Sequence, residues 1–190
     1  GLKCCKMIRL FVALALPDQC RQRLVALGGG IDGARWGDVR DLHITLRFVG
    51  EVSELVIDDI VQALGGIRAA PVEIALNGAG QFASKARVRA VWIGVEKNQG
   101  LMALHAKVDR ALIRIGLSPE RRKYTPHVTI GRMNGARPNH VQRWLEVNGA
   151  FFALPFKAHS FVLYESRLGR HGADYTPVAE FPFLEDCSRF

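Results

Sequence analysis

Two histidines in this sequence each stand two positions before a threonine. Residues 43–46 read His-Ile-Thr-Leu, and residues 127–130 read His-Val-Thr-Ile. In a β-strand alternate side chains point to the same face, so each histidine would lie beside its threonine, with the apolar residues behind them. The whole chain has only six histidines and four threonines, which makes two such motifs an improbable coincidence. Their separation, close to half the chain, predicts two similar halves that share one site.

Two histidines at one site would form an acid–base pair. Because an imidazole titrates near pH ~6.5, one ring can accept a proton while the other donates one. Phosphodiester chemistry uses such a pair, and each proton transfer accelerates the reaction ~10²–10⁴-fold. The hydroxyls of Thr45 and Thr129 could hold the non-bridging phosphate oxygens, and an arginine could stabilise the developing charge. His43, His127 and the two threonines are therefore the candidate catalytic residues.

Other chemistries fit these residues less well. Two histidines can bind zinc, but a catalytic zinc normally has a third protein ligand, and no carboxylate or cysteine stands at ligand spacing to either motif. A serine hydrolase is disfavoured because the sequence has no Gly-x-Ser-x-Gly motif. We therefore expect no metal and no cofactor. The simplest alternative is that both motifs are ordinary strand residues on a polar sheet surface.

The charge of the chain indicates an anionic partner. The net charge is +8 and the isoelectric point about 9.7, which favours nucleic acid. Cysteines at positions 4, 5, 20 and 187 lack metal-ligand spacing, so we expect reduced thiols in a cytoplasmic protein. No apolar run approaches the ~20 residues of a membrane span. The clustered basic residues are Lys85, Arg87, Arg89, Arg121, Arg122, Lys123, Arg132 and Arg137.

The hydrophobic pattern predicts an α+β fold in which strands and helices are interspersed. Residues 35–49 should form a short strand, a turn at Gly37-Asp38 and the first motif strand. We expect further strands over 8–16, 72–76, 88–95, 127–132, 151–154, 156–164 and 175–181, and helices over 17–28, 53–64, 99–116 and 138–147. Gly50 should end the first motif strand, and Asn77, Gly78 and Gly80 should form a turn. Hairpin-like pairs of strands favour antiparallel sheets. We predict a single domain over residues 7–190, preceded by an extension at 1–6.

At these motifs the sequence resembles the 2H phosphoesterase superfamily. The branch that it resembles is the RNA 2′,3′-cyclic phosphodiesterases, historically called the bacterial 2′-5′ RNA ligase family. The resemblance rests on residues 9–14, 42–52, 126–132 and 163–166, and it extends over about 7–183. It implies two antiparallel sheets with outer helices, arranged as two lobes with pseudo-two-fold symmetry around a central cleft. It also implies metal-independent opening of a terminal RNA 2′,3′-cyclic phosphate to a 2′-phosphate, with RNA, including tRNA fragments, as the partner of a monomer.

The resemblance also implies roles for individual residues. His43 would donate a proton to the leaving 3′ oxygen, and His127 would activate water. Arg132 matches a phosphate-contacting arginine, although strict alternation puts it on the face opposite His127, so a bend near Gly131 is needed. Arg47 shares the face of His43 by alternation and is an alternative cation.

Two aromatic residues, Phe11 and Tyr124, are candidates for stacking on the terminal base; a core position is the alternative for each. His105 on the long helix is expected to be structural. The same site could also run in reverse and join RNA ends by a 2′-5′ linkage. The alternatives to the RNA enzyme are a non-catalytic module that binds RNA ends, and a phosphodiesterase for small cyclic nucleotides or ADP-ribose cyclic phosphate.

Overall fold

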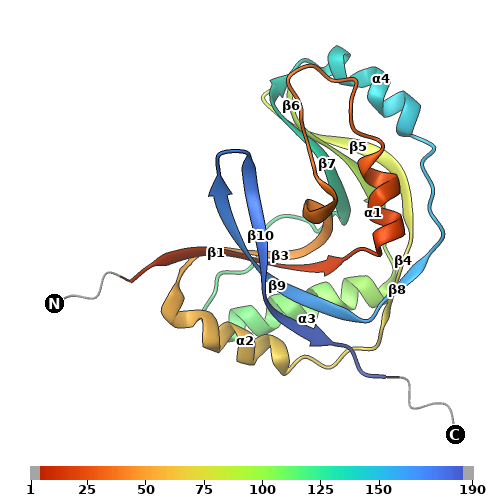
Figure 1. The fold of residues 1–190 in the computed structure, drawn as a ribbon. Helices are drawn as coiled ribbons and strands as arrows, with labels where there is room; N and C mark the ends of the chain where they lie inside the picture. The colour runs from red at the N-terminus through yellow and green to blue at the C-terminus, as the bar shows by residue number, and fades with distance from the viewer. Residues whose placement is uncertain (1–4, 186–190) are drawn as a thin grey trace, which may run out of the picture.

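The computed structural model describes residues 5–185 and confirms the α+β class (Figure 1). Four helices and ten strands alternate along the described chain, with two short 3₁₀ helices between them. The helices are α1 (Asp18–Val25), α2 (Ile57–Gly65), α3 (Gln99–Arg114) and α4 (Pro138–Asn148), and the 3₁₀ helices are η1 (Val39–Asp41) and η2 (Glu54–Val56). The strands are β1 (Met7–Ala15), β2 (Arg35–Trp36), β3 (His43–Ser53), β4 (Val72–Ile74), β5 (Leu76–Ser84), β6 (Arg87–Val95), β7 (His127–Ala136), β8 (Phe156–Ala158), β9 (Ser160–Gly169) and β10 (Gly172–Pro182).

These strands form two four-stranded antiparallel sheets and one small two-stranded sheet. The first sheet has the order β10-β9-β1-β3, the second β2-β7-β6-β5, and β4 pairs with β8. Each large sheet therefore contains one motif strand, β3 or β7, paired with a neighbour, β1 or β6. The strands β3 and β7 also contact each other, so the two sheets meet along the strands that carry the motifs. This arrangement confirms the expected pair of antiparallel sheets.

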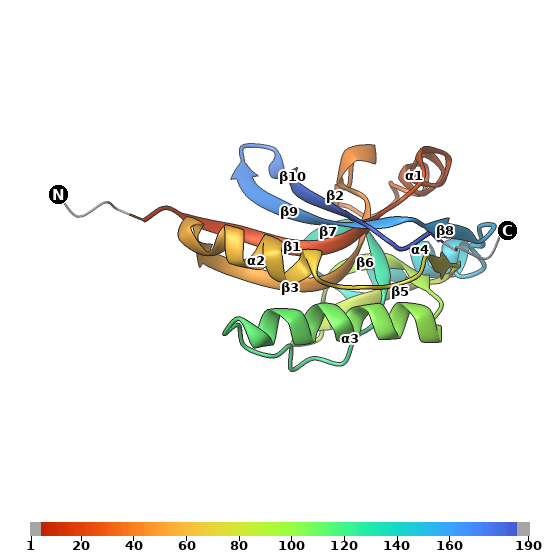
Figure 2. The same cartoon turned by 90° about the horizontal axis from the view of Figure 1, so that it is seen from below.

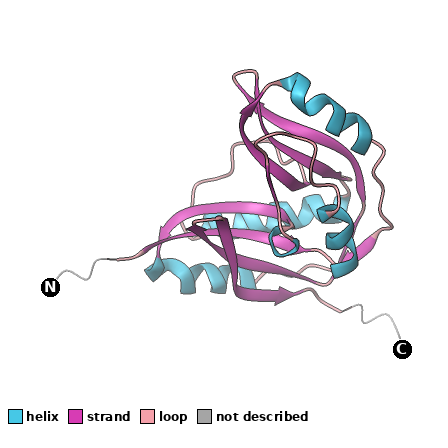
Figure 3. Cartoon of the chain, turned by 45° about the horizontal axis from the view of Figure 1, so that its top comes forward, coloured by secondary structure: helices cyan, strands magenta, loops and turns pink. Residues whose placement is uncertain are grey.

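The helices cover the outer faces of the sheets. Figure 1 shows α2 and α3 together below the strands β1 and β3, Figure 2 shows α2 in front of these strands in the view from below, and Figure 3 shows helices on the outside of the strands. Helix α3 buries one stripe, which consists of Leu101, Leu104, Val108, Ala111 and Leu112, and Asn98 caps its first turn by accepting a hydrogen bond from Leu101 N at 2.8 Å. Fully burying one such leucine contributes about 1.5–3 kcal/mol, so this stripe fixes the helix to the sheets.

Two glycine-based expectations are wrong, and in both cases the backbone forms a bulge. Gly50 does not end its strand: β3 continues to Ser53, with Gly50 at φ 84° beside a register shift against β1. The segment around Gly78 is not a turn but part of β5, again with a register shift. A glycine can adopt a positive φ, so it allows a strand to bend without ending it.

The hairpin turn between β5 and β6 lies instead at Lys85 and Ala86. Both residues have positive φ, 50° and 59°, which suits a two-residue hairpin but is uncommon outside glycine. The strand expected at 151–154 is wrong, because the structure has only an isolated bridge there, between Phe152 and Asn77. Other boundaries differ by a few residues; the helix expected at 17–28, for example, begins at Asp18 and ends at Val25. Of the cysteines, Cys4 and Cys187 lie outside the described residues, while Cys5 and Cys20 carry free thiols. No helix within residues 5–185 is long and apolar enough to cross a membrane.

Candidate active site

The two motif histidines are held in the same way. Nδ1 of His43 lies 2.7 Å from the main-chain oxygen of Asp41, and Nδ1 of His127 lies 2.7 Å from that of Thr125. A carbonyl oxygen can only accept, so in each ring Nδ1 carries the proton and donates it. Nε2 is then the free nitrogen of each neutral ring. In His43 it lies 3.1 Å from Oγ1 of Thr45, and in both motifs Nε2 is the basic nitrogen.

Aromatic side chains hold both imidazole rings in place. The ring of Phe11 lies 4.7 Å from that of His43, and Tyr175 meets the same imidazole edge-on at 5.2 Å. On the other side, Phe82 meets His127 edge-on at 4.8 Å, and Trp92 lies 5.8 Å away. Both histidines are therefore packed against rigid groups, which limits the orientations that their rings can adopt.

One cavity of about 760 Å³ joins the two motifs. Both histidines and both threonines line it, together with Arg132, so the structure brings these five side chains to a single site. The remaining lining comes from both sheets and from the hairpin that links β9 to β10, and includes Arg9, Phe11, Arg35, Trp36, Phe48, Ser166, His171 and Tyr175. A volume of this size accommodates a nucleotide-sized ligand.

β-Bulges decide which arginine reaches the cavity. In β7 the register against β6 shifts between Thr129 and Gly131, so that Ile130 and Gly131 are both buried and Arg132 returns to the face of the histidine. The expected bend near Gly131 is thus present. A Cβ on Gly131 would lie 2.7 Å from the ring of Trp36, so only glycine fits this close approach.

The equivalent bulge in β3 has the opposite consequence for Arg47. The register against β1 shifts between Thr45 and Arg47, and Phe48 takes the place on the cavity face that Arg132 takes in β7. The prediction that Arg47 shares the face of His43 is therefore wrong. Strict alternation failed because the bulge inserts one extra residue between the threonine and the arginine.

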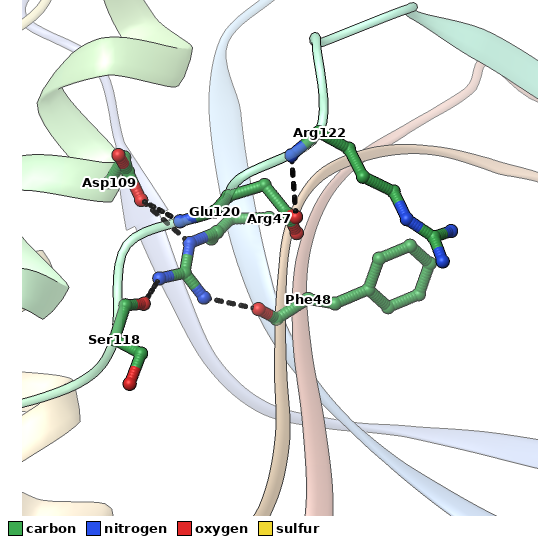
Figure 4. Close-up of polar contacts among 6 residues, drawn as sticks. All are labelled: Arg47, Phe48, Asp109, Ser118, Glu120 and Arg122. Carbon is green, nitrogen blue, oxygen red and sulfur yellow. Dashed lines mark hydrogen bonds and ion pairs between the residues drawn. The ribbon is translucent and has the colours of Figure 1, made fainter.

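Arg47 instead anchors α3 and the loop that follows it (Figure 4). Its side chain is 5% exposed and lies 2.8 Å from Oδ1 of Asp109, and it also donates to the main-chain oxygens of Phe48 and Ser118. Asp109 in turn accepts from Glu120 N at 3.4 Å. The guanidinium is thus occupied by structural partners.

The two aromatic candidates have different positions. Phe11 lines the cavity but is buried, with its ring stacked on Tyr164 at 5.2 Å and tilted against the ring of His43. Tyr124 is not placed for base stacking: its hydroxyl donates to the main-chain oxygen of Thr45 at 2.9 Å, and its ring stacks on His105 at 4.0 Å. Tyr124 therefore connects the segment before the second motif to the strand of the first, and this correction follows from the tertiary contact.

Several cavity residues were not among the candidates from the sequence. Phe48 is 57% exposed and lines the cavity. Tyr175 lies against His43, although these two residues are 132 positions apart along the chain. The aromatic residue that follows the first motif was a usable signal for Phe48. Arg35 and Trp36 enter the site because the short strand β2 pairs with β7 at Arg132 and Gly131.

The electrostatics of the cavity favour neutral histidines. The pKa of His43 is lowered to about 4, mainly by burial and also by the positive charges of Arg132 and His127, while the hydrogen bond to the Asp41 carbonyl acts in the opposite direction. The pKa of His127 is also lowered, mainly by burial and also by Arg132. An anion that enters the cavity would therefore raise the pKa of both histidines.

The other His, Cys, Asp and Glu side chains of residues 5–185 do not indicate a metal site. Within the described part of the chain, no three His, Cys, Asp or Glu side chains are grouped so that they could hold a metal ion. His105 is half-buried against Tyr124, His140 and His159 are exposed, and His171 is exposed at the rim of the cavity.

Known proteins resemble this chain in sequence and in fold. A family model described as the 2′-5′ RNA ligase superfamily matches residues 31–170. An RNA 2′,3′-cyclic phosphodiesterase of Aeropyrum pernix is 45% identical over 143 residues, which cover 74% of this chain and 81% of the relative. A protein of the same name from Thermotoga maritima is 33% identical over 192 residues, covering 96% of this chain and 100% of the relative.

A solved structure with the same fold is the crystal structure of E. coli LigT complexed with 3′-AMP. It superimposes with a TM-score of 0.80 at 25% identity, and the match covers 95% of this chain and 100% of that one. The likeness therefore extends over both sheets and the helices that cover them.

Proposed function

The chain belongs to the 2′-5′ RNA ligase superfamily, and we propose that it hydrolyses the 2′,3′-cyclic phosphate at the end of an RNA to a 2′-phosphate. The observation that carries this proposal is the convergence of two equivalent histidine–threonine pairs and Arg132 in one cavity. Each histidine keeps Nε2 free for the substrate, because a main-chain carbonyl holds Nδ1. Such a pair can accept and donate a proton in one reaction.

In this mechanism His127 and His43 act on opposite sides of the phosphorus atom. His127 accepts a proton from water as the water oxygen bonds to phosphorus. The bond between phosphorus and the 3′ oxygen breaks, and a protonated His43 gives its Nε2 proton to that oxygen. The products are a free 3′-hydroxyl and a 2′-phosphate, and the enzyme ends with the proton on His127 instead of His43. Exchange with solvent restores the starting state.

The negative charge of the substrate would allow His43 to act as an acid. In the free protein its pKa is about 4, so the ring is neutral near pH 7. A cyclic phosphate is an anion, and a negative charge within ~4–6 Å favours the imidazolium. We infer that substrate binding raises the pKa of His43 and so prepares the acid only when there is a leaving group to protonate.

Thr45, Thr129 and Arg132 would stabilise the phosphate as charge develops on it. The two hydroxyls lie beside the two histidines in the cavity, and Arg132 is close enough to lower the pKa of both imidazoles. Charge-assisted hydrogen bonds of this kind are short and directional. Phe11 would then support the ring of His43 from behind instead of stacking on a base.

The same geometry allows two RNA ends to be joined. If the 5′-hydroxyl of a second RNA takes the place of water, loss of its proton to His127 and departure of the 3′ oxygen give a 2′-5′ linkage. We further propose that RNA fragments, such as those from tRNA, are the substrates of a cytoplasmic monomer. Light scattering of the purified protein tests the last point.

The test is incubation with a short RNA that ends in a 2′,3′-cyclic phosphate, followed by product analysis. We expect a 2′-phosphate product, unchanged rates in EDTA, and a loss of about 10²–10⁴-fold in kcat in His43→Ala and in His127→Ala. His140→Ala is the matched control, because His140 is exposed on α4. Near-full activity in either motif variant with an unchanged melting temperature would overturn the acid–base pair, and loss in EDTA restored by zinc would favour a metal site.

A further inference from the structure

Acidic and basic residues are distributed unequally between the two large sheets. Residues 76–95, which include β5 and β6, and residues 127–145, which include β7, contain no Asp or Glu. The sheet that contains β1, β3, β9 and β10 is balanced: its cations are Arg9, Arg47 and Arg167, and its anions are Glu51, Glu165, Asp174 and Glu180. Among the strands of the two large sheets, the excess of positive charge therefore lies on the sheet that contains β5, β6 and β7.

The cations of the acid-free sheet gather at the β5–β6 hairpin. Lys85 lies in its turn, Arg87 and Arg89 begin β6, and all three side chains are exposed. A Cβ on Gly135, near the end of β7, would lie 3.3 Å from Cβ of Arg87 and 3.5 Å from Nη1 of Arg89, so these arginines lie over the neighbouring strand. The ion pairs found within residues 5–185 involve none of these three cations. We call Phe82, Lys85, Arg87 and Arg89 the hairpin surface.

This hairpin surface is continuous with the active site. Ala90 of β6 pairs with Phe82 of β5 on one side and with Arg132 of β7 on the other. One row of paired residues across the sheet therefore connects the hairpin with Arg132. Phe82 is 39% exposed and touches the ring of His127. An exposed aromatic beside the reacting groups, followed by unpaired cations, is the arrangement with which proteins bind single-stranded nucleic acid.

A smaller cavity of about 320 Å³ beside the main one carries mixed charge. It shares Arg9, Ser166 and Leu168 with the main cavity and is also lined by Lys6, Arg167, Glu51 and Glu165. Nε of Arg167 donates to Glu165 at 3.0 Å, so part of this positive charge is paired within the protein. The hairpin surface contains no carboxylate and therefore attracts a phosphate backbone more strongly.

We propose that the hairpin surface binds the RNA strand that precedes the terminal nucleotide. Phe82 provides a stacking face, and the three cations contact successive phosphates. The proposal rests on the function proposed above, since it assumes that the reacting end is RNA. It adds that the enzyme prefers an oligonucleotide over a cyclic mononucleotide, because the hairpin surface of β5 and β6 binds the additional nucleotides.

The experiment compares two substrates, a nucleoside 2′,3′-cyclic monophosphate and an RNA of about ten nucleotides that ends in the same group. The test variant is Lys85→Gln/Arg87→Gln/Arg89→Gln. The control variant, Arg68→Gln/Arg110→Gln/Arg114→Gln, removes the same charge from exposed positions on and near α3, whereas the cavity residues come from other elements. Both variants change exposed side chains, and circular dichroism checks that they fold.

We expect the test variant to lose at least about ten-fold in kcat/KM for the RNA and to change less than about two-fold for the cyclic mononucleotide. For the RNA, the plot of log kcat/KM against log salt concentration should become flatter by about 2, since each lost phosphate contact removes about 0.7 from the slope. The control variant should behave like the wild type. Equal effects on both substrates, equal effects of both variants, or no effect of the test variant would each overturn the proposal.

Failure of the underlying function gives a different result. If the wild type opens neither substrate, the proposed function is wrong. If the wild type opens both at rates that the hairpin variant leaves unchanged, the function stands and the hairpin surface is not the RNA-binding surface.

Discussion

At the scale of single residues, the chemistry depends on how each imidazole is tied to the backbone. The carbonyl two residues before each histidine fixes Nδ1 as the protonated nitrogen, and Nε2 is left for the substrate. The neighbouring charges then set the protonation state. Arg132 is the cation that affects both rings, so it links phosphate binding to proton transfer.

The pKa of His43 should therefore depend on the ligand. In the free protein we expect a pKa of about 4, and binding of a nucleoside 2′-phosphate should raise it, because the phosphate anion stabilises the imidazolium. NMR titration of the imidazole signals with and without the ligand measures both values. A pKa that is unchanged on binding would contradict substrate-assisted protonation; His159, which is exposed, serves as an internal reference.

Replacing Arg132 by glutamine should affect rate and titration together. We expect kcat to fall about 10²–10³-fold, the cost of losing one preorganised donor to a developing charge. Removal of its positive charge should also raise the pKa of both His43 and His127, because that charge lowers each of them in the wild type. The pH–rate profile and the NMR titration report these two effects. A loss of rate with unshifted histidines would mean that Arg132 lies elsewhere in solution.

At the scale of elements, the two motif strands are equivalent up to the threonine and diverge after it. Both bulge at the next residue, and the side chain that returns to the cavity is Phe48 in β3 and Arg132 in β7. The site is thus symmetric in its acid–base groups and asymmetric in its phosphate-binding charge.

Gly131 permits the bulge in β7, and alanine should not fit there. Its Cβ would lie 2.7 Å from the Trp36 ring, and Trp36 is itself held by β2 and packs on Trp144 at 6.2 Å. We expect Gly131→Ala to cost about 1–3 kcal/mol in unfolding free energy and to lower kcat by displacing Arg132. Urea unfolding and kinetics measure the two effects. Gly66→Ala is the control, because its Cβ would meet no atom closer than 3.5 Å. Wild-type stability and rate in Gly131→Ala would refute this role.

At the scale of the whole molecule, the site exists because two sheets meet at β3 and β7. Two side chains hold the segment that enters β7 against the first sheet. Arg47 binds Asp109 and the main chain at Ser118, and Tyr124 binds the main chain at Thr45. Both contacts join residues more than 60 positions apart, so they fix the relative position of the two histidines.

The ion pair between Arg47 and Asp109 should therefore affect stability more than chemistry. Arg47→Met leaves the carboxylate of Asp109 without its partner and should cost about 3 kcal/mol. The double variant Arg47→Met/Asp109→Leu should recover much of that loss, because apolar packing replaces the pair. Denaturant unfolding measures the cycle, and kcat per folded molecule should remain within a few-fold of the wild type. A large loss of kcat without loss of stability would return Arg47 to the list of phosphate ligands.

Much of the site follows from the sequence alone. The strand period of two places each histidine beside its threonine, and that relation is local, so it needs no knowledge of neighbouring strands. The same holds for the long helix expected over 99–116, whose apolar residues recur at helical spacing. The paired motifs and the positive charge also indicated the chemistry and the class of substrate.

Only the tertiary structure decided the rest. A bulge is a mismatch between two strands, so the exchange of Arg47 for Phe48, and the return of Arg132 to the cavity, depend on β1 and β6 as much as on the motifs. Partners distant along the chain determine the positions of Tyr124, Tyr175 and Trp36. The two reacting histidines can therefore be identified from the local sequence. The position of Arg132, the positive charge beside them, depends instead on the register between strands, because register is a property of two neighbouring strands together.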